Sequence, residues 1–283
     1  MVRTVIKSLF LRENFRTFDS TEVIENLKES GYAMIEGFAS KKTIRELSTE
    51  FDFLLSLASY AGTKRNISNG EYGLCPIELI EKNKDKCGKT FEFLTHKNLK
   101  KIGEDYLNAQ DEKIEINNQI EFEINHSKGR STASLPHFDR MPALKMFIYL
   151  TDVKQKSGAT FLFPKTYREV RRHIFSSLSS ISDIHELKNF ISASKIPKEE
   201  FFIECRKGTL VIIDTAGLHG GGNILEDNVT RKVIRGITWY LPASFQHLNT
   251  AAIGISDELF AENMGQPSLP TVAFDTFDEI NSA

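Results

Sequence analysis

The chain has 283 residues, of which 40% are hydrophobic and 26% are charged, so it is long enough to form a substantial core. The 36 basic residues nearly balance the 38 acidic residues, which argues against the broad basic surface that nucleic acid requires. No apolar run approaches the roughly 20 residues that span a bilayer, and the N-terminus shows no cleavable signal pattern. Three cysteines (Cys75, Cys87 and Cys205) fit no zinc framework, so we expect free thiols in a cytoplasmic protein without a membrane partner.

The first part of the chain, about residues 18–110, is expected to be mainly helical. Asp19 and Glu22 resemble a helix-capping pair, and Gly31 stands where that helix would end. Residues 32–38 then suit a short strand.

A second helix is expected to follow Ser40, because apolar residues recur at helical spacing from there to Ala58. Residues 60–90 contain several glycines and are expected to be rich in loops, which either fold over an active site or form irregular surface. Residues 94–108 are expected to be helical.

The second half of the chain, about residues 114–245, is rich in predicted strands. Short apolar strands separated by glycine and proline turns are typical of a sandwich or jelly roll. A helical insertion is expected at about 166–200 and a C-terminal tail at 246–283, within one domain that covers 1–283. The predicted strands are 120–124, 145–153, 160–163, 201–205, 209–214 and 231–241.

The sequence Leu-Pro-His-Phe-Asp at 135–139 carries the first candidate metal ligands. Side chains alternate between the two faces of a strand, so His137 and Asp139 would point to the same side. Two histidines and one carboxylate form the facial triad that binds Fe(II) and leaves coordination positions open. His219, which we expect at the end of an apolar strand, would supply the third ligand.

An arginine, Arg231, follows His219 after twelve residues, where a second strand is expected to begin. A hairpin-like unit formed by these two strands would bring Arg231 into the layer of the metal. Its guanidinium can bind a carboxylate through two parallel hydrogen bonds, as the distal carboxylate of 2-oxoglutarate would require.

These residues, together with residues 150–158 and the pair Phe163-Pro164, give the chain a family resemblance. Over residues 20–245, and most strongly in 135–165 and 207–240, it resembles the phytanoyl-CoA dioxygenase-like branch of the Fe(II)/2-oxoglutarate oxygenases.

The resemblance implies an α+β fold with a double-stranded β-helix (jelly-roll, cupin-like) core and flanking helices. It further implies an oxidoreductase that uses Fe(II), 2-oxoglutarate and O2 to hydroxylate a small molecule, with release of succinate and CO2. His137, Asp139 and His219 would hold the iron, and Arg231 would hold the cosubstrate.

The resemblance also places aromatic residues around the cosubstrate. Phe147 and Phe122 fall at positions where the family has side chains that line the 2-oxoglutarate pocket. Arg235 lies on the same strand face as Arg231 and would assist at the cosubstrate, contact the substrate or form a salt bridge. Gly221 replaces a serine that some relatives have two residues after the distal histidine.

The carboxylate of Asp139 favours hydroxylation, or desaturation or ring closure, over halogenation, because related halogenases have a small residue there. Asp214 is either a partner of the metal site or a turn residue at a strand end. Arg140 and Lys145 flank the HxD strand and would either meet an anionic substrate or be solvated, and we expect solvation. Glycines 220–222 either let the backbone approach a ligand or form a flexible turn.

Two other functions fit the same residues. The chain could be a non-catalytic jelly-roll protein that binds a metal for structure or sensing. It could also be a cupin-like metalloenzyme that does not use 2-oxoglutarate, in which case Arg231 would contribute little to activity.

Overall fold

The computed structural model describes residues 14–67, 70–107, 114–126, 128–129, 143–167 and 200–240. The helices are α1 (Ser20–Ser30), α2 (Lys41–Tyr60), α3 (Ile77–Lys82), α4 (Gly88–Leu94) and α5 (Lys97–Leu107). The strands are β1 (Tyr32–Ile35), β2 (Arg65–Ile67), β3 (Gly70–Pro76), β4 (Ile114–Asn125), β5 (Ala143–Tyr149), β6 (Phe161–Leu162), β7 (Phe201–Phe202), β8 (Leu210–Asp214), β9 (His219–Gly220) and β10 (Arg231–Tyr240).

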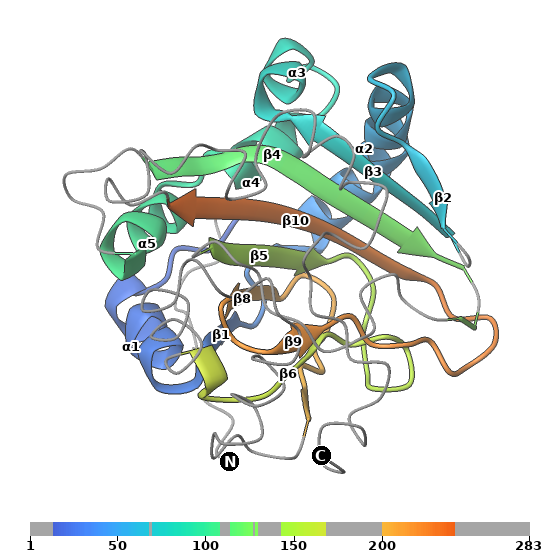
Figure 1. Ribbon diagram of the computed structural model, residues 1–283. Coiled ribbons are helices and arrows are strands. Elements are labelled where there is room, and N and C mark those ends of the chain that lie inside the picture. Colours follow the sequence, from blue (N-terminus) through green and yellow to red (C-terminus); the bar gives the residue numbers. More distant parts are fainter. Residues whose placement is uncertain are drawn as a thin grey trace, which may run out of the picture.

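The strands form two antiparallel sheets (Figure 1). The large sheet has the order β1-β8-β5-β10-β4-β3-β2, and the small sheet has the order β7-β6-β9. From β5 onward the chain passes to the small sheet for β6 and β7 and then alternates between the sheets through β8, β9 and β10. The described part of the chain is thus a mixed helical and antiparallel β structure.

Local capping signals determine the first two helices, as the sequence predicts. The Asp19 carboxylate accepts a hydrogen bond from the Thr21 amide, and Gly31 ends α1 in the left-handed conformation with φ 83°. The Ser40 hydroxyl accepts a hydrogen bond from the Thr43 amide at the start of α2.

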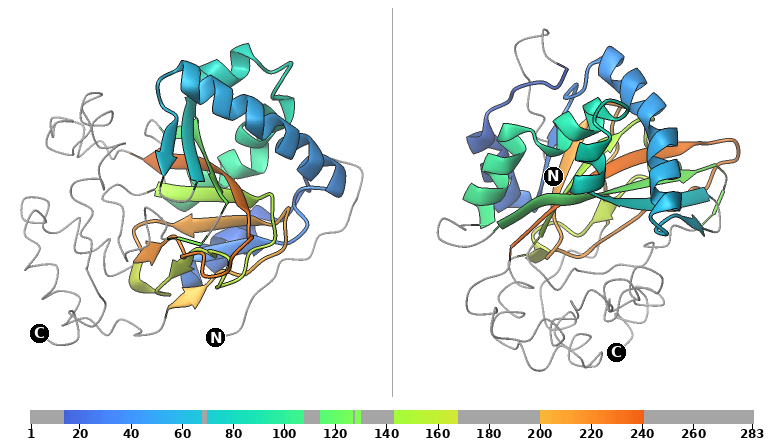
Figure 2. Two further views of the ribbon diagram at one scale, coloured as in Figure 1. Left: turned by 90° about the vertical axis from the view of Figure 1, so that its right-hand side faces the viewer. Right: turned by 90° about the horizontal axis from the view of Figure 1, so that it is seen from above.

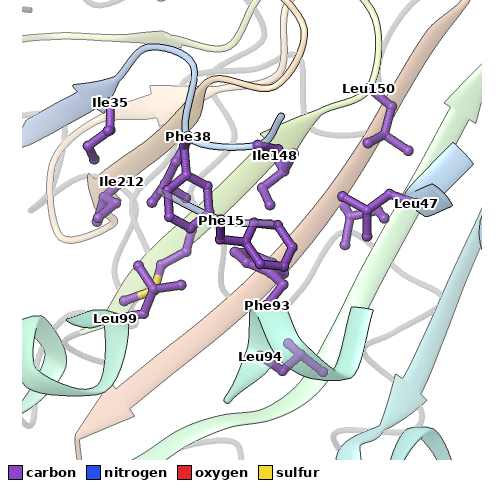
Figure 3. Close-up of a cluster of buried hydrophobic side chains, with 14 of the residues drawn as sticks. Phe15, Ile35, Phe38, Leu47, Phe93, Leu94, Leu99, Ile148, Leu150 and Ile212 are labelled. Atoms are coloured by element: carbon purple, nitrogen blue, oxygen red, sulfur yellow. The ribbon is translucent and has the colours of Figure 1, made fainter. Parts of the chain in front are cut away.

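The two faces of the large sheet belong to two different hydrophobic clusters. Ile148 and Ile212 pack with the helices (Figure 3), whereas Phe147 and Ile213 pack with residues of the small sheet and its neighbours. This division follows from the alternation of side chains along a strand. The helices therefore cover one face of the large sheet and the small sheet lies against the other (Figure 2).

The expectation of a loop-rich segment at 60–90 is wrong. Most of this segment forms β2, β3, α3 and the start of α4, and β3 pairs with β4 from Gly70↔Asn125 to Pro76↔Gln119. Glycines and a proline within β3 read as turn residues, but pairing with β4 outweighs that local preference.

Two other expectations about the ends of elements differ from the structure. The helix expected at 94–108 is α5 alone, which Thr95 and His96 separate from α4. The strand expected at 209–214 is confirmed as β8, but the expectation that a strand ends at His219 is wrong, because the Asp214 carboxylate accepts a hydrogen bond from the Ala216 amide (3.0 Å) and turns the chain. His219 instead begins β9 in the small sheet, so it forms no hairpin with β10.

Within the described ranges, no helix has both the length and the apolar character needed to cross a membrane. The predicted helical insertion falls largely, and the C-terminal tail entirely, outside the described residues.

Candidate active site

A pocket opens between the two sheets and encloses about 430 Å³, including its solvent-open part. The large sheet contributes charged and aromatic side chains, and the small sheet contributes His219 and the glycines that follow it. Residues far apart in the sequence thus meet in one cavity. They are Glu123, Lys145, Phe147, Tyr149, Thr160, His219, Gly220, Gly221, Arg231, Val233 and Arg235.

His219 is buried, with 5% of its surface exposed, and one ring nitrogen is fixed by the backbone. Nδ1 lies 2.9 Å from the Gly217 carbonyl oxygen. Because a carbonyl oxygen only accepts hydrogen bonds, Nδ1 carries a proton, and in the neutral imidazole Nε2 carries the lone pair. Metal-binding histidines are commonly oriented in this way, so this side chain fits the role of a ligand.

The other two predicted ligands, His137 and Asp139, lie outside the described residues. Within the described ranges, no group of three or more His, Cys, Asp or Glu side chains could hold a metal ion. The position of the HxD pair relative to His219 therefore stays a prediction. Asp214, the other candidate partner, forms the turn before His219 and accepts a hydrogen bond from the Tyr106 hydroxyl (2.7 Å).

Arg231 is buried with 3% of its surface exposed and is held by three acceptors. Nε donates to the Asn125 side-chain oxygen (2.9 Å), Nη1 to the Gly158 carbonyl (2.7 Å) and Nη2 to the Glu123 carboxylate (2.7 Å). A guanidinium has five N–H groups, so these bonds fix its orientation, and two N–H groups make no hydrogen bond to the described residues. Although Arg231 and His219 belong to different sheets, they line the same pocket.

Glu123 is a buried carboxylate between two arginines. Oε1 lies 2.7 Å from Arg231 Nη2, and Oε2 lies 3.7 Å from Arg235 Nη2. Burial raises the pKa of Glu123, but the two guanidinium charges and the hydrogen bonds from Asn125 and Arg231 outweigh burial and hold the pKa below its ordinary value. Glu123 is therefore ionised at neutral pH and compensates the charge of Arg231.

Arg235 and Lys145 line the pocket from neighbouring strands. Arg235 pairs with Phe147 and Lys145 pairs with Ile237, so the two cations are diagonal neighbours on one face of the sheet. The guanidinium carbon of Arg235 lies 5.8 Å from the centre of the Tyr72 ring, within the range of a cation–π contact. The expectation that Lys145 is simply solvated is wrong, because it is partly buried in the pocket wall.

Aromatic and hydroxyl groups form the wall beside Arg231. Phe147 lines the pocket, and its ring is stacked against that of Tyr149 with centres 6.3 Å apart. The Tyr149 and Thr160 hydroxyl oxygens are 2.8 Å apart, and burial raises the pKa of the Tyr149 phenol, which stays protonated. The backbone of Phe122 lies in β4 opposite Gly73 and Ile234, but its side chain is outside the described part of the structure.

Gly222 permits a close approach of two backbone segments at the edge of the pocket. A Cβ atom at this position would overlap the carbonyl oxygen of Ala159, so the structure has no room for any other residue. The neighbouring Gly158, with φ 86°, presents the carbonyl that holds Arg231. The close approach at Gly222 is to the backbone of Ala159, so an approach of glycines 220–222 to a ligand stays a prediction.

Sequence reasoning missed Glu123, Asn125, Tyr149 and Thr160. Glu123 alternates with apolar residues in β4, as a pocket-facing residue would, but its partners depend on the pairing of β4 with β10. A single sequence does not show that register.

No family model matches the chain, and no curated protein matches it in sequence. Solved structures do share its fold. The carbocyclase SnoK, a non-haem α-ketoglutarate-dependent enzyme from nogalamycin biosynthesis, is 16% identical (TM-score 0.54) over 80% of this chain and 88% of its own. HygX from Streptomyces hygroscopicus, with nickel and 2-oxoglutarate bound, is 10% identical (TM-score 0.52) over 77% of this chain and 86% of its own. EvdO2 from Micromonospora carbonacea var. aurantiaca, complexed with 2-oxoglutarate, is 14% identical (TM-score 0.52) over 82% of this chain and 95% of its own. The chain therefore has the fold of these solved structures, in which helices accompany antiparallel sheets.

Proposed function

We propose that the protein is an Fe(II)- and 2-oxoglutarate-dependent dioxygenase of the phytanoyl-CoA dioxygenase-like branch that acts on a small molecule. His137, Asp139 and His219 would hold the iron, and Arg231 would bind the distal carboxylate of 2-oxoglutarate. The observation that carries the proposal is that a correctly oriented histidine and a fixed arginine, brought from different sheets, line one pocket. The solved neighbours with bound 2-oxoglutarate have the same fold.

The ends of two segments support the proposed triad. The segment that contains His219 begins at Thr215, whose amide donates to the Ala143 carbonyl (3.1 Å). It ends at Ile224, which exchanges two backbone hydrogen bonds with Gly129 (3.0 and 3.1 Å). The segment that contains His137 and Asp139 runs between the same partners, Gly129 and Ala143. Each end of the segment with His219 is thus hydrogen-bonded to a residue at one end of the segment with His137 and Asp139. This arrangement favours convergence of the side chains of the two segments.

We further propose that the two sheets are the walls of a double-stranded β-helix. Its chain alternates between two facing antiparallel sheets, as this chain does from β7 to β10. In this arrangement the pocket is the interior of the barrel, and its mouth is where the substrate enters.

The metal and the cosubstrate together would supply the oxidising chemistry, with conversion of 2-oxoglutarate to succinate and CO2. The protein residues would bind and orient. Arg231 would bind the distal carboxylate through its two other N–H groups, and its hydrogen bonds to Glu123, Asn125 and Gly158 hold it in place. Phe147 would line the cosubstrate pocket, with Phe122 and Arg235 as further neighbours.

We propose hydroxylation of a C–H bond as the reaction, because Asp139 leaves the carboxylate ligand intact. Desaturation or ring closure would require the same site. SnoN and SnoK, which share the fold, are an epimerase and a carbocyclase.

The test uses the wild-type protein with Fe(II) and O2, and compares 2-oxoglutarate with 2-oxobutyrate, which lacks the distal carboxylate. We expect formation of succinate from 2-oxoglutarate, and at least about tenfold weaker use of 2-oxobutyrate, because a charged hydrogen bond to Arg231 is lost. Product formation is followed by mass spectrometry, with and without iron. Absence of succinate would favour the non-catalytic metal-binding protein, and equal use of both acids would favour an enzyme in which Arg231 has no role as anchor.

A further inference from the structure

A buried turn between the two sheets carries His219. The turn runs from Asp214, the last residue of β8, to His219, the first residue of β9, and all residues between them are buried. The orientation of the imidazole depends on this turn, because Nδ1 is bonded to the Gly217 carbonyl oxygen (2.9 Å). The groups that hold the turn in place therefore also hold the imidazole.

The Asp214 carboxylate joins one end of this turn to the helical layer. Oδ1 accepts a hydrogen bond from the Ala216 amide (3.0 Å), and Oδ2 accepts one from the Tyr106 hydroxyl (2.7 Å). The Gly217 amide donates to the Asp214 carbonyl (3.1 Å), so side chain and backbone close the turn together. Because Tyr106 belongs to α5, a helix remote in the sequence fixes the side chain on which the turn depends.

Asp214 acts from the face of the large sheet that the helices cover. It is paired with Leu144 of β5 and lies two residues after Ile212, and both of these residues pack with the helices. Side chains alternate along a strand and paired residues share a face, so Asp214 points towards the helices, where Tyr106 lies. The described residues that line the pocket between the sheets include His219 but not Asp214. Asp214 therefore reaches the candidate metal site only through the turn.

The small sheet holds the other end of the turn. The Leu218 amide donates to the Thr166 hydroxyl (2.9 Å), and the Leu218 carbonyl accepts a hydrogen bond from the Phe163 amide (2.9 Å). Loss of the Asp214 contacts should thus loosen the turn without detaching it from the protein.

We propose that Asp214 and Tyr106 are positioning residues for the metal ligand His219, because they fix the turn that holds the imidazole with Nε2 available to the iron. The proposal rests on the proposed function, in which His219 is assigned to the iron. Groups that orient a metal ligand commonly contribute to metal affinity, although they do not touch the metal.

The first measurement follows the exchange of the His219 Nδ1 proton with water, by nuclear magnetic resonance of the metal-free full chain. The His219→Gln variant identifies the signal. We expect exchange to be at least about tenfold faster in Tyr106→Phe and in Asp214→Ala, because the hydrogen bond to the Gly217 carbonyl is weakened. Asp214→Asn keeps an acceptor for the Ala216 amide and should stay near the wild-type rate.

The second measurement is the affinity for Zn(II), by calorimetry with the same proteins. Asp214→Ala should bind zinc about tenfold more weakly than the wild-type protein, Tyr106→Phe should change in the same direction by less, and Asp214→Asn should again stay near wild type. If Asp214→Ala does not fold, the isosteric Tyr106→Phe decides the result.

Thr90→Val is the matched control. It removes another buried hydroxyl that donates to a carboxylate, that of Glu50 (2.7 Å), in α4 and without contact to the turn. This variant should lose stability but keep the wild-type proton exchange and zinc affinity. Folded Tyr106→Phe and Asp214→Ala proteins that match the wild type in either measurement would overturn the proposal. Failure of the wild-type protein to bind zinc or iron would instead count against the proposed function, whereas proton exchange would still show whether Asp214 and Tyr106 hold the imidazole.

Discussion

His219→Ala is expected to remove iron binding and to abolish the formation of succinate. The imidazole is buried and its Nδ1 is bonded to the Gly217 carbonyl, so in the neutral imidazole Nε2 has the lone pair that a metal requires. Loss of a residue that merely orients a ligand already costs about 10- to 100-fold in metal affinity, and loss of the ligand itself should cost more. Iron content after gel filtration and succinate formation are the two measurements.

His126→Ala is the matched control for this change. His126 is exposed, lies just beyond the end of β4 and does not line the pocket. This variant should retain iron and activity. A His219→Ala protein that folds, binds iron stoichiometrically and produces succinate at the wild-type rate would show that His219 is a structural histidine.

Of the single variants proposed here, Glu123→Ala is expected to give the largest decrease in the free energy of unfolding. It leaves the Arg231 charge buried without its carboxylate at 2.7 Å, and breaking a buried pair in this way costs about 3–5 kcal/mol. Because whole domains are stable by only about 5–15 kcal/mol, the denaturation midpoint should fall markedly. The measurement is chemical denaturation monitored by circular dichroism.

Two comparisons separate the buried pair from an ordinary ion pair. Glu71→Ala breaks the partly exposed pair with Lys64 and should cost less than about 1 kcal/mol. The double variant Glu123→Ala/Arg231→Met removes both charges and should be more stable than Glu123→Ala alone. Equal losses for Glu123→Ala and Glu71→Ala would contradict the role of the buried pair.

The pH dependence follows from the same carboxylate. Burial raises its pKa, but Arg231 and Arg235 hold the net value below that of a glutamate in the unfolded chain, about 4.3. The unfolded state therefore binds the proton more readily, so the stabilisation is present above about pH 4.3 and is lost as the pH falls towards the folded-state pKa. In Glu123→Gln, the unfolding free energy should fall less steeply over this acid range than in the wild-type protein.

Elements with strong local signals could be predicted from the sequence. Asp19 and Ser40 cap helices through contacts with residues two and three positions later, and Gly31 ends a helix because it tolerates a positive φ. The short strand β3 could not be predicted, because pairing with β4, more than forty residues away in the sequence, stabilises it against its glycines.

The residues of the candidate site also fall into two groups, those that could be predicted from the sequence and those whose role depends on strand pairing. Residue type and spacing indicated His219 and Arg231, the family resemblance indicated Phe147, and all three line one pocket. Glu123 and Lys145 were missed or misread because their environments depend on the register of β10 with β4 and β5. Charge patterns across strands become informative only when that register is known.

The most direct test of the central claim is anaerobic titration of the wild-type protein with Fe(II) and 2-oxoglutarate, monitored by visible absorbance. The claim is that His137, Asp139 and His219 hold one ferrous ion beside a cosubstrate that Arg231 binds. We expect a weak visible charge-transfer band that saturates at one iron and one 2-oxoglutarate per chain and is absent with either component alone. A folded protein that shows no such band at saturating concentrations would contradict the account.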